Sequence, residues 1–201
     1  MQVRAIALGA GVLCLASVAY AGIVVKTPNF SIPQNSTQAI TFSVTGGQNS
    51  ALEDIEGMVF TVQIGDGLGA TPSMTSVDML TGTIWSGHVS PANVIVPIGG
   101  DDPQFQSRSL FTDLPGDFVD ANGILATVVF DTTGAAEGDY TVILTGTMDP
   151  GSDSQFYSGV GDPVAATFLT ATLTVTPIPA PAATPLLMLA WVRSPRRRER
   201  F

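Results

Sequence analysis

Alternation of apolar with small or polar residues, in short runs separated by turn residues, limits this chain to β-structure. The pattern is clearest in residues 122–147, where it runs from 124 to 131 and again from 140 to 147. A two-residue period places successive side chains on opposite faces of a strand, as in a half-buried sheet. The residues between the two runs include Gly134 and Gly138, so we predict that the runs are neighbouring antiparallel strands.

Similar runs occur at a regular spacing along the chain, which is typical of a β-sandwich. No helical period is sustained, and 201 residues with an apolar share of 45% suit one modest domain. The sequence therefore predicts an all-β, antiparallel β-sandwich. The predicted strands are 23–26, 38–44, 58–64, 75–80, 83–85, 93–96, 107–112, 124–130, 140–147 and 165–175.

The run from 124 to 130 also predicts which side chains enter the core. Residues of one parity point to the same side of a strand. We therefore expect Ile124, Ala126, Val128 and Phe130 to face the opposite sheet.

A secretory signal peptide is predicted at the N-terminus, in residues 1–21. Arg4 precedes an apolar run, and Ala19 and Ala21 form a small-x-small cleavage motif. The apolar run is shorter than the roughly 20 residues that span a bilayer, which argues against a retained anchor. The only cysteine, Cys14, lies in this segment, so the mature chain has no disulfide, cysteine nucleophile or thiolate metal site.

The body of the chain is strongly acidic. Between Gly22 and Thr176 there are sixteen Asp and Glu residues and only two basic residues, Lys26 and Arg108, which gives a net charge of -14. Nucleic acids bind through cationic side chains that neutralise phosphates. This charge balance therefore excludes nucleic acids and other polyanions as partners of the domain.

The composition changes beyond Thr176. Residues 177–185 have prolines at 177, 179, 181 and 185 and predict a stiff, extended linker. The remaining segment, 186–201, starts with a short apolar stretch and ends in an arginine cluster. The predicted organisation is thus a signal peptide (1–21), a sandwich domain (22–176), the linker (177–185) and this tail (186–201).

Two segments of the domain resemble a known family. The run GILATVVF, followed after a glycine-bearing turn by DYTVIL, resembles the late strands of cohesin-like sandwich domains. More loosely, IEGMVFTVQIGDG at 55–67 is similar to an early core strand of that family. The resemblance covers most of residues 23–176 and implies a jelly-roll, cohesin-like sandwich of about nine strands. Such sandwiches serve as protein-binding and as carbohydrate-binding modules.

The tail resembles a PEP-CTERM sorting signal, which combines a proline motif, an apolar segment and a terminal basic cluster. Pro179 and Pro181 stand where that family has Pro-Glu-Pro, with Ala180 in place of the glutamate. The resemblance implies export to the bacterial cell surface, a transient membrane tether through the tail, and an exosortase-type processing enzyme as a partner. The alternative is a disordered basic tail.

Catalytic motifs are scarce, whereas oxygen ligands for calcium are plentiful. His88 is the only histidine, and the sequence has no nucleophile elbow or zinc-type histidine pair. We therefore expect no enzyme activity and no required cofactor. Asp117, Asp120 and Asn122 precede Gly123 and predict a calcium site, because Ca²⁺ prefers carboxylate and amide oxygens. The alternative is a solvated acidic rim.

Aromatic side chains in turn-rich stretches supply a second candidate site. Trp85, Phe156 and Tyr157 lie outside obvious strand interiors and could stack on sugar rings. The alternative for these rings is core or edge packing. The sequence does not place them on one face.

These observations predict an exported, surface-sorted, non-catalytic β-sandwich. We expect it to act as a structural, adhesion or protein-binding component of the cell envelope or extracellular matrix, with an envelope protein or polysaccharide as partner. The alternative function is a carbohydrate-binding module linked to polysaccharide metabolism.

Overall fold

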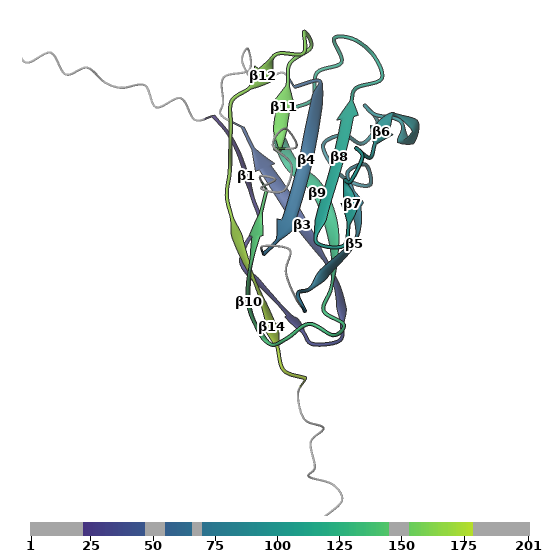
Figure 1. Cartoon of the computed structure of the whole chain (residues 1–201). Helices are drawn as coiled ribbons and strands as arrows, with labels where there is room; N and C mark the ends of the chain where they lie inside the picture. The colour runs from purple at the N-terminus through teal and green to yellow at the C-terminus, as the bar shows by residue number, and fades with distance from the viewer. Residues whose placement is uncertain (1–21, 47–54, 66–69, 145–152, 179–201) are drawn as a thin grey trace, which may run out of the picture.

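A computed structural model describes residues 22–46, 55–65, 70–144 and 153–178. These residues form two packed β-sheets (Figure 1). The only helical element in this part of the chain is one 3-10 turn, η1 (Pro91–Asn93). Within the same residues, no helix is long and apolar enough to cross a membrane.

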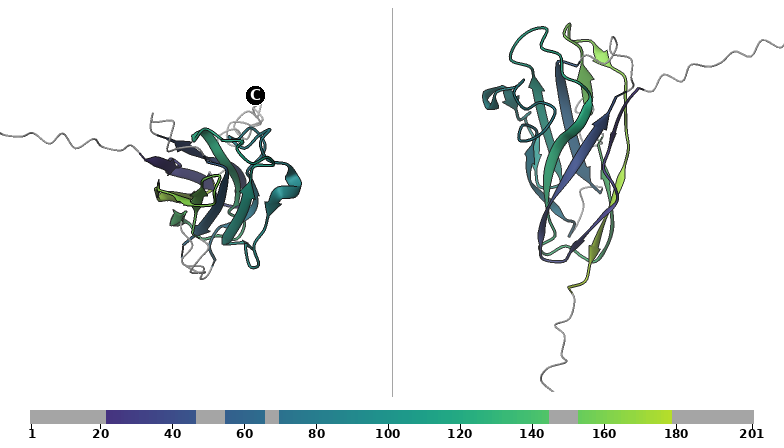
Figure 2. Two further views of the ribbon diagram at one scale, coloured as in Figure 1. Left: turned by 90° about the horizontal axis from the view of Figure 1, so that it is seen from above. Right: turned by 180° about the vertical axis from the view of Figure 1, so that it is seen from behind.

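The first sheet has five strands in the order β13–β1–β3–β9–β5. The view from behind in Figure 2 shows this sheet. Its members are β13 (Ala166–Phe168), β1 (Ile23–Lys26), β3 (Thr37–Thr45), β9 (Asn122–Asp131) and β5 (Ser73–Asp78).

The second sheet has nine strands and follows the order β12–β11–β4–β10–β14–β2. Strand β8 pairs with the other edge of β4, and the short strands β6 and β7 pair with β8. The bounds are β12 (Pro163–Val164), β11 (Gln155–Tyr157), β4 (Gly57–Ile64), β10 (Gly138–Ile143), β14 (Ala171–Thr176), β2 (Phe30–Pro33), β8 (Phe105–Phe111), β6 (Val94–Ile95) and β7 (Asp101–Asp102).

The core lies between the sheets and is made by the inward parity of their strands. Phe42 of β3 and Phe60 of β4 meet across the interface with ring centroids 5.6 Å apart in an edge-to-face arrangement. Both rings are fully buried, as is Phe130 of β9. Aromatic pairs of this geometry contribute beyond their buried area, so the pair links the sheets directly. The predicted all-β sandwich is confirmed.

The N-terminal and C-terminal segments of the domain each contribute strands to both sheets. Strand β1 lies in the first sheet and β2 in the second, and each runs parallel to a C-terminal strand, β13 and β14 respectively. The predicted antiparallel sandwich of about nine strands did not include these two parallel pairings. Pro28 and Pro33 concealed β2 in the sequence, yet Pro33 is tolerated because β2 is an edge strand.

The prediction that the runs at 124–131 and 140–147 are neighbouring strands was wrong. Strand β9 pairs with β3 and β5 in the first sheet, whereas β10 pairs with β14 and β4 in the second. The link between them therefore crosses from one layer to the other. Its first residue, Thr132, is buried and donates from Oγ1 to the carbonyl of Pro33 over 2.7 Å. Residues 145–147 lie outside the described part of the chain.

The predicted inward parity of β9 was correct at Ala126, Val128 and Phe130 but wrong at Ile124. A register shift between Phe42 and Ser43 pairs Phe42 with Ala126 and Ser43 with Ile124. Leu125 is the extra residue of this β-bulge and is fully buried, while Ile124 is 41% exposed. A bulge reverses the facing of the residues on one side of it.

Two further strand predictions were corrected. Residues 83–85 form a turn instead of a strand, and this turn places Trp85 in the core. The predicted strand 165–175 is split into β13 and β14, which belong to different sheets.

Candidate functional site

The solvent-facing surface of β6, β8, β4 and β11 presents a strip of apolar and uncharged polar residues. In one row across the strands, Ile95 lies opposite Ser109, Ser109 opposite Val59, and Val59 opposite Gln155. Directly opposed residues of antiparallel strands point to the same side of the sheet. The alternate residues of β4, such as Met58, face the core. The row therefore faces outward.

A second row on the same face consists of Phe111, Gly57 and Tyr157. The rings of Phe111 and Tyr157 lie on either side of Gly57 with centroids 5.6 Å apart. A Cβ atom on Gly57 would lie 2.2 Å from Cδ1 of Phe111. The missing side chain thus allows the Phe111 ring to lie across β4. We call the residues of both rows the outer strip.

The outer strip leaves large apolar groups in contact with water. Ile95 is 61% exposed and Phe111 is 45% exposed. Exposed apolar residues continue into the loop after β6, with Val96 at 48% and Ile98 fully exposed. Exposed apolar side chains gathered on one part of a surface are a feature of interaction sites in soluble proteins.

A compact loop, residues 112–118, borders one end of the outer strip. Thr112 N donates to the carbonyl of Glu56 (2.8 Å), and Gly116 N donates to the Glu56 carboxylate at Oε1 (2.7 Å). His88 donates from Nδ1 to Asp117 Oδ1 over 2.9 Å, because a carboxylate only accepts. These contacts fix the loop against β4 and against the turn that carries His88.

The residues predicted to bind calcium do not converge on one point. Asp117 is turned toward His88, while Asp120 Oδ1 accepts a hydrogen bond from Asn122 Nδ2 over 2.7 Å. Asn122 Oδ1 accepts from Gly46 N over 3.2 Å. Among the described residues, no three His, Cys, Asp or Glu side chains are grouped as metal ligands would be. Calcium binding by this set stays a prediction.

Asp113 is an exposed, hydrogen-bonded carboxylate in the loop 112–118. Its Oδ1 accepts from Ser90 N (2.9 Å) and from Asn93 Nδ2 (2.8 Å). The hydrogen bond from the Ser90 backbone, followed by that from Asn93, lowers the pKa of Asp113 below its ordinary value. Asp113 therefore carries its negative charge at neutral pH.

Only one of the three predicted stacking residues is accessible. Trp85 and Phe156 are fully buried in the core, so the prediction that they stack on a glycan was wrong. Both residues lie near turn residues in the sequence. The local pattern therefore did not show that the fold directs their side chains into the core. Tyr157 is half-buried and lies in the outer strip beside Phe111.

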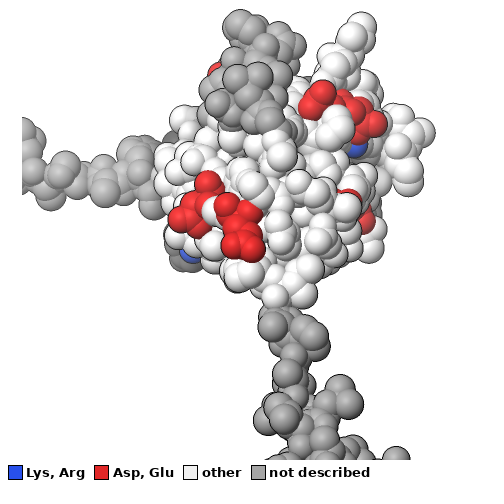
Figure 3. All heavy atoms as spheres, turned by 60° about the horizontal axis from the view of Figure 1, so that its bottom comes forward, with Lys and Arg blue, Asp and Glu red and all other residues white. Residues whose placement is uncertain are grey.

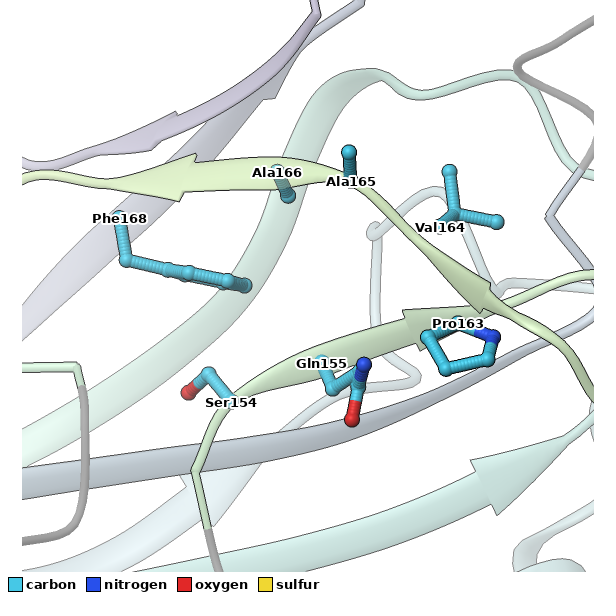
Figure 4. Close-up of a pocket in the computed structure, with 7 residues that line it drawn as sticks. All are labelled: Ser154, Gln155, Pro163, Val164, Ala165, Ala166 and Phe168. Carbon is cyan, nitrogen blue, oxygen red and sulfur yellow. The ribbon is translucent and has the colours of Figure 1, made fainter.

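A hollow of about 350 Å³ lies where the chain passes from β12 to β13. Figure 4 shows Ser154, Gln155 and Pro163 along one side and Ala166 and Phe168 along the other. The Ser154 hydroxyl is committed to β4, since Oγ accepts from Thr61 N (2.8 Å) and donates to Thr61 O (2.9 Å). The hollow therefore has no free hydroxyl at that wall for a ligand.

The residues predicted to direct processing lie outside the described part of the chain. They are Ala19, Ala21, Pro179 and Pro181. Sequence reasoning missed most of the outer strip. Gly57 inside a strand-like run was the available signal, because an isolated strand glycine often marks close approach of another group.

No family model matches the sequence, and no curated protein matches it. Solved structures do match. A cohesin from Acetivibrio cellulolyticus in complex with a dockerin is similar with a TM-score of 0.57 at 14% identity, covering 76% of this chain and 98% of that chain. The seventh ScaB type I cohesin from Pseudobacteroides cellulosolvens is similar with a TM-score of 0.55 at 15% identity, covering 80% of this chain and 96% of that chain.

A non-cellulosomal cohesin from the archaeon Archaeoglobus fulgidus is similar with a TM-score of 0.53 at 13% identity, covering 78% of this chain and 92% of that chain. At these identities the likeness concerns the fold. The domain has a cohesin-like β-sandwich fold. The fold-level part of the sequence resemblance is thereby confirmed.

Proposed function

We propose that this domain is a non-catalytic protein-binding module that contacts its partner through the outer strip. The observation that carries the proposal is the aromatic pair of exposed Phe111 and half-buried Tyr157 beside Gly57, together with exposed Ile95 on the same sheet face. Aromatic residues on a rigid sheet are the groups that dominate protein interfaces. The dockerin complex of the similar Acetivibrio cellulolyticus domain supports protein binding as the class of function.

The test compares the outer strip with an apolar site of equal exposure elsewhere. Leu169 is 44% exposed and Phe111 45%, so Leu169→Ser is a matched control for Phe111→Ser. Each immobilised variant is incubated with extracellular proteins of the source organism, and retained proteins are identified by mass spectrometry. We expect one protein to be retained by wild type and by Leu169→Ser and lost with Phe111→Ser and Ile95→Ser. Equal retention by all variants would reject the outer strip as the binding surface.

Carbohydrate binding is the second candidate, because half-buried Tyr157 and exposed Phe111 form an aromatic pair on the outer face of the sheet. Aromatic faces of this kind can stack on sugar rings. Affinity electrophoresis in gels containing envelope polysaccharide separates the two functions. Retardation of wild type, abolished by Tyr157→Ala, would favour a carbohydrate-binding module, whereas unchanged mobility favours the protein partner.

We further propose that the protein is exported and sorted to the cell envelope or matrix. The proposal rests on the signal-like segment 1–21 and on the order of linker, apolar stretch and arginine cluster in 177–201. The apolar stretch is too short for stable membrane retention, so an exosortase-type enzyme would be needed to process the tail. We expect the mature protein to lack residues 196–201, and intact-mass measurement of envelope material checks this. A chain from Gly22 to an unmodified Phe201 would contradict sorting.

A further inference from the structure

The segment between β6 and β7 leaves the sheet edge and returns to it. β6 pairs with β8 at Leu110 and Ser109, and β7 pairs with it at Gln106 and Phe105. Residues 96–100 form the excursion between these pairings, at the side of the sandwich next to β8 (Figure 1). Ile98 at its tip is fully exposed, so this side chain has no role in the core.

Arg108 holds the base of this turn. The residue is only 9% exposed and lies beneath the excursion on β8. Its Nη1 donates to the carbonyls of Gly100 (2.9 Å) and Ser107 (2.8 Å), and its Nη2 donates to Asp101 Oδ1 (2.9 Å) and Gln106 Oε1 (2.8 Å). Four acceptors offset the cost of burying the guanidinium.

The turn is also closely packed at Gly100. A Cβ atom there would lie 3.0 Å from the Pro97 carbonyl oxygen and 3.2 Å from the Ser107 Cβ. Gly100 N donates to that same carbonyl over 2.8 Å. The tip is therefore held in one conformation before any partner arrives, which lowers the ordering cost of binding.

The charges next to the tip are negative. The Asp101 side chain is 68% exposed, and Asp102 is exposed beside it. In the described ranges, the Lys and Arg residues are Arg108, which is buried, and Lys26, which lies on β1 of the other sheet. The view of the lower face in Figure 3 likewise shows patches of carboxylates with little blue. A second copy of this chain would bring like charges together, whereas a cationic partner complements them.

Resting on the proposed function, we infer that the braced turn is the specificity element of the interface. Ile98 inserts into an apolar pocket on the partner protein, and Lys or Arg side chains around that pocket contact Asp101 and Asp102. Arg108 is a positioning residue for this contact. The outer strip supplies the remaining apolar area.

Site-specific photocrosslinking tests the inference. The variants Ile98→p-benzoyl-Phe, Phe111→p-benzoyl-Phe and, as a control, Leu169→p-benzoyl-Phe are irradiated in the full chain with the extracellular protein fraction. We expect crosslinks from positions 98 and 111 to one protein, and a crosslinked peptide at position 98 that has Lys or Arg beside apolar residues. Asp102→Asn should weaken the crosslink at 98 in low salt and have little effect in high salt, since salt screens exposed charges.

Each other outcome is decisive. Crosslinking from 111 but not from 98 would overturn the specificity element and leave the proposed function intact. A position-98 crosslink to a peptide without cationic residues, to a second copy of this chain, or one insensitive to Asp102→Asn would also overturn it. Crosslinking from neither position above the Leu169 control would reject both proposals. Once the partner is purified, Ile98→Ser should weaken its affinity by about tenfold or more.

Discussion

The outer surfaces of the two sheets are built from different residues, although their inner surfaces are alike. On the five-stranded sheet, the outward pairs of β3 and β9 are Ala39 with Val129, Thr41 with Thr127 and Ser43 with Ile124. These are mostly short β-formers that a solvated sheet face tolerates. The other sheet instead exposes the outer strip, which includes the aromatic pair of Phe111 and Tyr157.

The comparison distinguishes the residues that stabilise the fold from those that we propose to contact a partner. Phe60 and Phe130 are equally buried on the two inner faces, so the core gives no reason for the outer faces to differ. Ile124 is also 41% exposed on the five-stranded sheet, but the exposed aromatic ring of Phe111 lies on the other sheet. Apolar surface in water is unfavourable, so this difference supports the proposal that a partner covers the outer strip.

The largest expected effect tests whether the inner faces of the two sheets contribute equally to stability. Phe60→Ala in β4 and Phe130→Ala in β9 should each lower the free energy of unfolding by about 3–5 kcal/mol, because each removes a fully buried ring. Urea denaturation of both variants measures this. A loss below about 1 kcal/mol for either residue would show that its sheet contributes little to the core.

The inner faces were also the part of the fold that the sequence predicted well. Alternation in 124–130 identified Phe130 as a core residue, and the run 58–64 was predicted as a strand without an assigned inward face, because burial on one face imposes the two-residue period. The period says nothing about the partner strand, so β9 and β10 looked like a hairpin although the Thr132 contact with Pro33 directs the chain into the other sheet. The β-bulge at Leu125 adds one residue to β9, and the sequence pattern around it does not indicate this extra residue.

The outer strip could be predicted only in fragments. Its members come from positions 57, 59, 95, 109, 111, 155 and 157, and the strand register alone brings them together. Buried Trp85 shows the converse error, since an aromatic residue among glycine and serine looked accessible in the sequence. Side-chain burial in turns depends on tertiary packing, which spacing does not encode.

A second prediction sharpens the comparison at Gly57. Gly57→Ala should lower the free energy of unfolding by about 1–3 kcal/mol, because the new Cβ displaces the Phe111 ring. In a protein that already carries Phe111→Ala, Gly57→Ala should lower the free energy of unfolding much less, because the ring that would clash is absent. A double-mutant cycle from urea denaturation measures the difference. Equal costs in the two backgrounds would mean that the glycine does not serve the aromatic pair.

A smaller effect separates binding from folding within the outer strip. Ile95→Ser should change the free energy of unfolding by only about 0.5 kcal/mol, because the side chain is 61% exposed. Thr41→Ala on the other outer face is the control and should be similarly neutral. Thermal and chemical unfolding measure both. A loss of several kcal/mol for Ile95→Ser would mean that the apolar face supports the fold, which would break the distinction between the two faces.

The smallest effect concerns one carboxylate beside each region. Hydrogen bonds lower the pKa of Asp113 at the rim of the outer strip, chiefly from Ser90 N, and the pKa of Asp131 at the end of β9, chiefly from Thr133. A carboxyl pKa that is lower in the folded state adds stability above its unfolded value of about 3.9, and that stability is lost as pH falls through the folded pKa. Asp113 is exposed and Asp131 is partly exposed, so solvent screening keeps each contribution small.

The free energy of unfolding should therefore fall as the pH is lowered from about 6 to about 3, and Asp113→Asn and Asp131→Asn should each reduce that fall slightly. Asparagine imitates the neutral carboxyl, so a variant has no favourable ionisation left to lose. We expect equal reductions, because both shifts arise from local hydrogen bonds and not from the character of the neighbouring sheet face. Urea denaturation at the two pH values checks this, with Asp102→Asn as an exposed control. A much larger reduction for Asp113→Asn would show that the rim is electrostatically coupled to the outer strip, and that the two regions differ in more than their apolar surface.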